Sequence, residues 1–229
     1  MGPDPSDAEH IERSRRAYGP SAGWFVDAVG TEVSERFEAI EDRAMLDAFV
    51  RLAAARRGPV LDAGCGVGRI ARYLADRGLD ASGVDVAPGM IREAETAHPD
   101  LRFEVAEFTR LPVADGALTG VAYWYSIITT PPEELATVWS ELARALSDGG
   151  VVLVAFQCGG GGWVERPKAY GTDTDLRLFH HDVEQVRAGL ADVAIPVRSV
   201  LRRGPLFAHE TTDQAVLIAH RPDGPGRPT

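Results

Sequence analysis

Residues 60–69, VLDAGCGVGR, combine an apolar run, an acid and three glycines at alternate positions. An apolar run that breaks into glycines predicts a buried strand that turns sharply into a helix. Because glycine lacks a Cβ, its backbone turns tightly and lets a ligand approach closely. Free N–H groups at the start of a helix attract a carboxylate or a phosphate. The stretch therefore predicts a ligand-binding loop, with a plain glycine turn as the less favoured alternative.

Short apolar runs alternate with amphipathic segments after this loop, as in repeated strand–helix–strand units. Strands are expected at residues 60–63, 81–84, 101–105, 121–126 and 151–156. Helices are expected at residues 69–77, 90–97 and 133–146. Strands that are apolar on both faces are typical of a parallel sheet covered by helices on each side. The predicted fold class is therefore α/β, a doubly wound, Rossmann-like sheet that is mostly parallel.

Further elements flank this core, which is expected to cover residues 58–156. Residues 10–57 show helical spacing of apolar residues, interrupted at Gly19, Pro20 and Gly30, and this pattern predicts a cap of two or three helices. After the core, a helix and two strands that pair as an antiparallel ribbon are expected at residues 182–190, 197–201 and 215–219.

The expected domain organisation follows from these elements. Residues 1–9 and 222–229 are rich in Pro, Gly and Asp and hold too little apolar surface to offset the loss of chain entropy, so disordered tails are expected there. A single domain is expected over residues 10–221, in which residues 157–221 form a lid and the C-terminal ribbon.

Composition narrows the class of protein. With 45% hydrophobic and 25% charged residues, the chain is typical of a globular protein. A formal net charge of −10 argues against nucleic acid as a partner, because phosphate backbones need a basic surface. Cys65 and Cys158 lie far apart without Cys or His partners at ligand spacing, so neither a disulfide nor a metal site is indicated. No apolar run approaches the ~20 residues that span a bilayer. A cytoplasmic protein without a membrane partner is expected, and its oligomeric state is left open.

A second acid, Asp85, ends the next expected strand, twenty-three residues after Asp62. At the end of a parallel strand, a carboxylate can accept both hydroxyl hydrogens of a ribose. An aspartate there is also a good helix N-cap, which is the alternative. The position of Asp85 within the strand–helix–strand unit favours nucleoside binding.

The glycines of residues 60–69 are spaced GxGxG, whereas the dinucleotide fingerprint is GxGxxG. With this spacing the chain resembles the class I S-adenosylmethionine-dependent methyltransferases, and more narrowly a small actinobacterial type. The resemblance extends from about Tyr18 to Arg221 and depends on five motifs in order: VLDAGCGVGR, GVDVAPGMI, FEVAEFTRLP, AYWYSIITTPPEEL and ALSDGGVVLVAF. It implies S-adenosylmethionine as the cofactor and methyl transfer to an O, N or C atom of a small-molecule acceptor such as a secondary metabolite.

The resemblance also implies a set of cofactor-binding residues at the expected strand ends. This set is Tyr18, Asp62, Gly64, Cys65, Gly66, Arg69, Asp85, Val86, Met90, Glu107, Phe108, Tyr125 and Ser126. In the family, the glycine loop passes along the methionine portion and the acid after the second strand holds the ribose. The residues after that acid and after the third strand surround the adenine, and the end of the fourth strand lines the reacting centre. For Val86, Met90 and Phe108, core packing is an equal alternative.

The acceptor is expected beyond the fifth strand, at residues 159–181, because ligands of open α/β sheets bind past the carboxyl ends of the strands. The glycines at 159–162 form either the hinge of a lid or a slack surface linker. Trp163 and Tyr170 are amphipathic residues that can enclose a flat organic substrate.

Three residues are candidate general bases for a phenol or an amine: His180, His181 and Tyr125. Two adjacent histidines rarely share one face, so at least one is expected at the surface. Similar sequences often carry histidine where Thr129 stands, and this difference removes a convenient base from the pocket.

Two alternatives to a methyltransferase stay open. A nicotinamide-dependent oxidoreductase would share the nucleotide-binding topology, although the GxGxG spacing counts against it. A non-catalytic module that binds S-adenosylmethionine would keep the same motifs, and only a transfer assay separates it from an enzyme.

Overall fold

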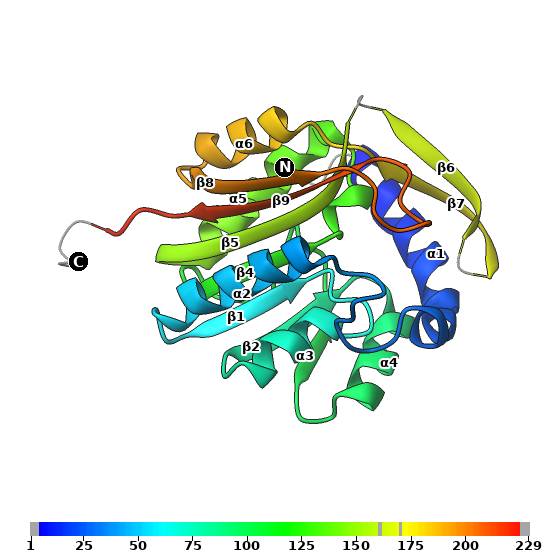
Figure 1. Cartoon of the computed structure of the whole chain (residues 1–229), viewed down its shortest axis with the longest axis horizontal. Coiled ribbons are helices and arrows are strands. Elements are labelled where there is room, and N and C mark those ends of the chain that lie inside the picture. Colours follow the sequence, from blue (N-terminus) through cyan, green and yellow to red (C-terminus); the bar gives the residue numbers. More distant parts are fainter. Residues whose placement is uncertain (1–4, 160–161, 170, 225–229) are drawn as a thin grey trace.

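The computed structural model describes residues 5–159, 162–169 and 171–224. A seven-stranded sheet of order β3-β2-β1-β4-β5-β9-β8 forms its centre (Figure 1). Its strands are β1 (Pro59–Ala63), β2 (Asp80–Asp85), β3 (Arg102–Val105), β4 (Leu118–Trp124), β5 (Leu146–Cys158), β8 (Val197–Arg203) and β9 (Asp213–His220). Strands β1 to β5 pair in parallel, whereas β9 runs antiparallel to both β5 and β8. The predicted doubly wound sheet with an antiparallel C-terminal ribbon is confirmed.

Helices cover the sheet on both faces, as Figure 1 shows. The helices are α1 (Pro5–Ala28), α2 (Ile40–Ala54), α3 (Arg69–Asp76), α4 (Pro88–Ala97), α5 (Leu135–Ala145) and α6 (Val183–Asp192). Apolar residues of α2 and α3 pack on one face of the sheet, and those of α5 and α6 pack on the other. Two short 3-10 turns, η1 (Ile127–Thr129) and η2 (Pro132–Glu134), connect β4 to α5.

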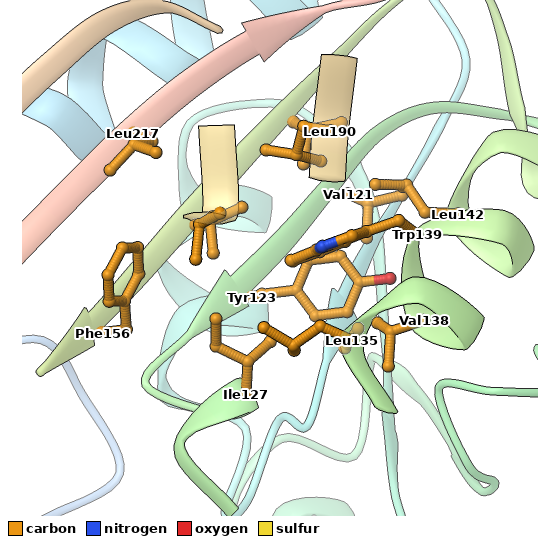
Figure 2. Packing of buried hydrophobic residues seen from close by; sticks show 14 of the residues in the cluster. Val121, Tyr123, Ile127, Leu135, Val138, Trp139, Leu142, Phe156, Leu190 and Leu217 are labelled. Atoms are coloured by element: carbon orange, nitrogen blue, oxygen red, sulfur yellow. The ribbon is translucent and has the colours of Figure 1, made fainter. Parts of the chain in front are cut away.

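Successive side chains of each strand point to opposite faces of the sheet, so each strand contributes to both cores. In β5, Leu153 belongs to the core under α2, while Val154 belongs to the core under α5, and both side chains are fully buried. Figure 2 shows Trp139 of α5 lying across the ring of Tyr123 in β4, edge to face at 5.8 Å between ring centres. Full burial of one such apolar side chain stabilises the fold by about 1.5–3 kcal/mol, so the paired cores hold the sheet as a rigid platform.

Helix α1 differs from expectation at both the tail and the glycine-proline pair. It begins at Pro5, inside the segment expected to be disordered, and it continues through Gly19 and Pro20, where a break was expected. Proline removes one helical hydrogen bond, but the helix packs along α4 and β7 and these contacts offset the loss. The other expected tail differs as well, since Asp223 pairs with Arg56 at 2.6 Å and the Pro222 carbonyl accepts the Gly149 amide at 3.1 Å. Residues 1–4 and 225–229 lie outside the described residues.

A β-hairpin occupies the segment that was expected to be a lid or a linker. Strands β6 (Trp163–Ala169) and β7 (Thr172–Phe179) form a separate antiparallel sheet that lies beside α1 (Figure 1). In β7, Leu176 and Leu178 are buried, whereas the preceding residue Asp175 is exposed. The strand therefore has one apolar face. The predicted substrate residue Tyr170 lies outside the described residues. Within the described part of the chain, no helix is long and apolar enough to cross a membrane.

Candidate functional site

The direction of chain progression reverses between β1 and β4, which are neighbours in the sheet. At such a switch point the connections leave to opposite sides and open a crevice at the carboxyl ends of the strands, where ligands bind in open α/β sheets. A cavity of about 300 Å³ lies there, lined by residues that follow β1, β2 and β4 and by residues of α1.

The glycine loop after β1 presents bare backbone to this cavity. Gly64 has a φ of +80°, and a Cβ on it would lie 2.3 Å from the Cβ of Ser126, so only glycine fits. Gly66 has a φ of +52° and lines the cavity, with no atom within 4 Å of where its Cβ would stand. The amides of Gly64 and Cys65 both donate to the carbonyl of Val84, at 2.8 and 2.9 Å, which ties the loop to β2.

Asp85 holds two backbone groups at the end of β2. Its Oδ2 accepts the Gly66 N–H at 2.9 Å and its Oδ1 accepts the Ala87 N–H at 2.8 Å. The N-cap of α4 is Ala87, so the alternative that Asp85 is itself the cap is wrong. Burial raises the pKa of the Asp85 carboxyl, against the effect of these backbone donors. Each carboxylate oxygen keeps a further lone pair that can accept a ribose hydroxyl.

Asp62 lies at the end of β1 with one oxygen engaged and one available. Its Oδ2 accepts the Ala71 N–H of α3 at 3.0 Å, whereas its buried Oδ1 has no hydrogen-bond partner among the described residues. Burial, with a smaller effect of Asp85, raises the pKa of Asp62 to about 7, against the opposing effects of the Ala71 amide and Arg69. Buried carboxylate oxygens need a partner, and an ammonium group in the cavity would provide one.

The remaining polar and apolar groups divide the cavity into a polar middle and an apolar end. The Ser126 hydroxyl also lines the cavity without a partner among the described residues. Tyr18, Met90 and Phe108 line the apolar end, where the rings of Tyr18 and Phe25 lie 5.8 Å apart. Burial raises the pKa of Cys65 well above its ordinary value, so this thiol stays protonated and acts as a small apolar wall. These groups fit a ligand with an ammonium, a ribose and a flat base.

Of the thirteen cofactor residues predicted from the sequence, twelve line this one cavity. The exception is Glu107, which lines an adjoining hollow with Val86 and Phe108 and whose carboxylate lies 3.5 Å from the guanidinium of Arg15. Parallel strands that end at one edge bring the other residues together.

The structure places the candidate bases differently. His181 does not line the cavity and is buried in the core. Its Nε2 lies 3.0 Å from the carbonyl oxygen of Ile127, and its ring packs on Phe156. Burial lowers the pKa of His181 and that of His180, which is also absent from the cavity wall. Tyr125 lines the cavity with a strained φ of +55°, and burial raises the pKa of its phenol, so it keeps its proton.

Among the lining residues that the sequence analysis did not identify, five come from β4, β5 and β9 or from two loops whose rings, Phe37 and His209, lie in contact. We call them the aromatic end: Phe37, Trp124, Gln157, His209 and Gln214. They come from the loop before α2, the ends of β4 and β5, the loop between β8 and β9, and the start of β9. The available signal in the sequence was that two glutamines, Gln157 and Gln214, interrupt apolar strands. The structure pairs these two residues directly opposite each other in β5 and β9.

A second hollow of about 370 Å³ lies between α1 and the β6–β7 hairpin. It contains Trp163, and it shares Ser14 and Thr129 with the main cavity. The guanidinium of Arg177 covers the Trp163 ring at 4.4 Å. The segment expected to hold the acceptor therefore borders a neighbouring hollow rather than the glycine loop.

Comparison with known proteins gives matches centred on the cofactor motifs. Residues 60–150 match the family described as a methyltransferase domain. The demethylmenaquinone methyltransferase of Beutenbergia cavernae is 37% identical over 114 residues, which are 49% of this chain and 45% of that protein. The malonyl-[acyl-carrier protein] O-methyltransferase of Enterobacter lignolyticus is 33% identical over 111 residues, 48% of this chain and 43% of that protein. The matches thus span less than half of either relative.

Among solved structures, the magnesium protoporphyrin IX methyltransferase of Synechocystis PCC 6803 with bound SAH superimposes with a TM-score of 0.68. It is 19% identical and covers 93% of this chain and 99% of that one. At this identity the similarity establishes the shared fold over almost the whole chain.

Proposed function

We propose that the chain transfers the methyl group of S-adenosylmethionine to an O, N or C atom of a small molecule, since residues 60–150 match a methyltransferase domain and the fold is shared with a solved methyltransferase. The observation that carries the proposal is the lining of the switch-point cavity. It combines the bare backbone of Gly66 with two buried polar atoms, Asp62 Oδ1 and Ser126 Oγ, that have no partner among the described residues.

Each part of the cofactor has a matching group. Asp62 Oδ1 would accept the ammonium of the methionine portion, and the Asp85 carboxylate would accept the ribose hydroxyls. Met90, Val86 and Phe108 would hold the adenine between apolar surfaces. When bound, the cofactor supplies a methyl group on a sulfonium, which is already an activated leaving group. The work left to the protein is to position the acceptor and to exclude water.

The oxidoreductase alternative fits this cavity less well, and the alternative of a non-catalytic binding module needs a separate test. A nicotinamide dinucleotide would bring its pyrophosphate to the glycine loop, where the GxGxG spacing departs from the GxGxxG fingerprint of dinucleotide sites. A non-catalytic binding module would have the same lining, so the transfer assay distinguishes it. The acceptors in the names of the two relatives, demethylmenaquinone and malonyl-[acyl-carrier protein], differ from each other and do not carry over to this chain.

Calorimetry with S-adenosylmethionine and with NAD tests the cofactor. We expect a micromolar Kd for S-adenosylmethionine and no binding of NAD, and the reverse preference would overturn the assignment. Incubation with cofactor labelled in its methyl group and a panel of phenols, amines and carboxylic acids then tests the reaction. Labelled cofactor that binds but never transfers to any acceptor would favour the binding module. Cys65 and Cys158 are free, which is consistent with our proposal that the protein works in the cytoplasm.

A further inference from the structure

We propose that the aromatic end of the cavity binds an uncharged, planar aromatic acceptor that carries a hydroxyl group. This inference rests on the proposed function, since it gives that reaction its acceptor. The aromatic end lies in the same cavity as the glycine loop and contains no residue of the cofactor set. A molecule bound there would share the cavity with the cofactor.

Aromatic rings form the walls of this end. The rings of Phe37 and His209 lie 5.3 Å apart, and Phe207 stacks behind His209 at 5.4 Å with an angle of 4° between the planes. The ring of Trp124, at the end of β4, meets the ring of Tyr125 of the cofactor set edge to face at 5.6 Å, which connects this end to the cofactor site. Flat aromatic ligands gain contact area and ring interactions between such walls.

Two ion pairs hold the loop that carries His209. Arg203, at the end of β8, donates to Glu210 at 2.7 Å and to Asp42 of α2 at 2.6 Å. Glu210 Oε2 also accepts the amides of Leu206 and Phe207, at 2.7 and 3.1 Å. Because these bonds fix the loop in advance, little ordering entropy is lost when a ligand binds against it.

The charges that line the cavity disfavour an anionic acceptor. Four carboxyl groups belong to the lining, Glu38, Asp62, Asp85 and Glu210, against the single guanidinium of Arg69. That guanidinium is already paired with Glu38 and donates to the carbonyl of Glu32 at 3.1 Å. Glu210 is likewise paired, with Arg203, so no cation of the described lining is left to bind a carboxylate or phosphate on the acceptor, and the carboxyl groups of Asp62 and Asp85 disfavour such an anion.

Polar groups at this end suit a hydroxyl. Gln157 and Gln214 lie opposite each other in the β5–β9 pairing, and the Gln214 amide donates to the carbonyl of Thr212 at 2.7 Å. His209 is exposed and belongs to the lining, so an imidazole nitrogen there can accept the hydrogen of an acceptor hydroxyl. The acceptor proton would pass to His209 while the new oxygen–carbon bond forms and the carbon–sulfur bond breaks, its electron pair staying on sulfur.

Binding of 2-naphthol and of 2-naphthoate to the full chain tests the acceptor class, with and without S-adenosylhomocysteine. The two probes share a ring system and differ in charge. We expect 2-naphthol to bind at least tenfold more tightly. Equal or tighter binding of 2-naphthoate, or no binding of 2-naphthol, overturns the inference. Cofactor affinity is measured separately, so its loss alone counts against the proposed function, and failure of 2-naphthol alone counts against this inference.

Two variants test where 2-naphthol binds and which residue accepts its proton. Phe37→Ala should weaken 2-naphthol binding at least fivefold and leave the Kd for S-adenosylmethionine within twofold. His209→Asn should lower methyl transfer to 2-naphthol at least tenfold, while the matched change His220→Asn, at the other end of β9, should leave it unchanged. If Phe37→Ala leaves 2-naphthol binding intact, the probe binds elsewhere and the inference fails. If 2-naphthol is bound but not methylated by the wild type, the hydroxyl acceptor is wrong.

Discussion

Gly89, at the start of α4, lies in backbone contact with Gly19 of α1, since a Cβ on Gly89 would lie 2.0 Å from the carbonyl oxygen of Gly19. No real Cβ tolerates that distance, so the helices cross this closely only because position 89 is glycine. The neighbouring residues Tyr18 and Met90 both line the apolar end of the cavity. The contact between two glycines therefore sets the distance between two walls of the proposed adenine site.

We expect Gly89→Ala to push α1 away from α4 and to weaken S-adenosylmethionine binding at least tenfold. Overpacking of a tight contact also costs about 1–3 kcal/mol of stability. The matched control is Gly23→Ala in α1, where no atom lies within 4 Å of the new Cβ. That change should stabilise the helix by roughly 0.5–1 kcal/mol and leave binding unchanged. Calorimetry and thermal unfolding of both variants check the prediction, and equal affinities would contradict it.

Asp85→Ala should weaken cofactor binding by roughly 1–3 kcal/mol, because hydrogen bonds to a charged acceptor are worth that much. The variant also loses the two backbone donors, Gly66 and Ala87, so Asp85→Asn is measured beside it to keep the shape of the side chain. Asp76→Ala, on the exposed side of α3, is the surface control. An unchanged Kd in Asp85→Ala would leave Asp85 with the role of holding the loop alone.

Asp62 should make the unliganded protein less stable as the pH rises from about 4 to about 7. The pKa of this carboxyl is raised from 3.8 to about 7 in the folded protein. Between these values the folded state keeps a proton that the unfolded state has released, so the free energy of unfolding falls with pH, at most by about 1.4 kcal/mol per unit. Denaturant unfolding at pH 5, 6 and 7 should show this loss in the wild type and a smaller loss in Asp62→Asn.

Cofactor affinity should change with pH in the opposite sense. The ammonium of S-adenosylmethionine would favour the ionised carboxylate of Asp62, so its affinity should rise between pH 6 and pH 8. Asp85 and Arg69 also act on this carboxyl and are unchanged in Asp62→Asn, so the difference between the two proteins isolates Asp62. The same pH dependence in both proteins would show that another group is responsible.

The cofactor-binding residues at the strand ends could be predicted from the sequence, because they lie in motifs that each follow a strand. Parallel strands end at one edge, so strand order alone brings Asp62, Asp85 and Ser126 together. The aromatic end could not be predicted in this way. Phe37 and His209 come from loops far apart in the chain, and their contact depends on how Arg203 pairs with Asp42 of α2.

Two of the errors in the fold have local reasons. Gly19 and Pro20 were interpreted as a helix break, but the backbone of Gly19 packs against Gly89 of α4, and this tertiary packing outweighs the weak helix propensity. The β6–β7 hairpin was missed because charged residues dominate its composition. The alternation of Leu176 and Leu178 with Asp175 and Arg177 was the available signal.

His181 should act on stability rather than on methyl transfer. His181→Ala removes the side-chain contact with the Ile127 carbonyl and opens a gap beside Phe156, so we expect a loss of about 2–3 kcal/mol and a Tm lower by roughly 4–10 °C. The η1 turn, which begins with Ile127, directly follows Ser126 of the cavity. We therefore expect His181→Ala to displace Ser126 only at temperatures at which the core itself unfolds. His180→Ala, at a partly exposed position, is the matched control and should change Tm far less. Measured well below the Tm, both variants should keep the wild-type Kd for S-adenosylmethionine and the wild-type transfer rate. If His181→Ala instead keeps its Tm and its cofactor affinity but loses transfer, His181 is the base after all, and the acceptor must reach it through the hollow beside Trp163.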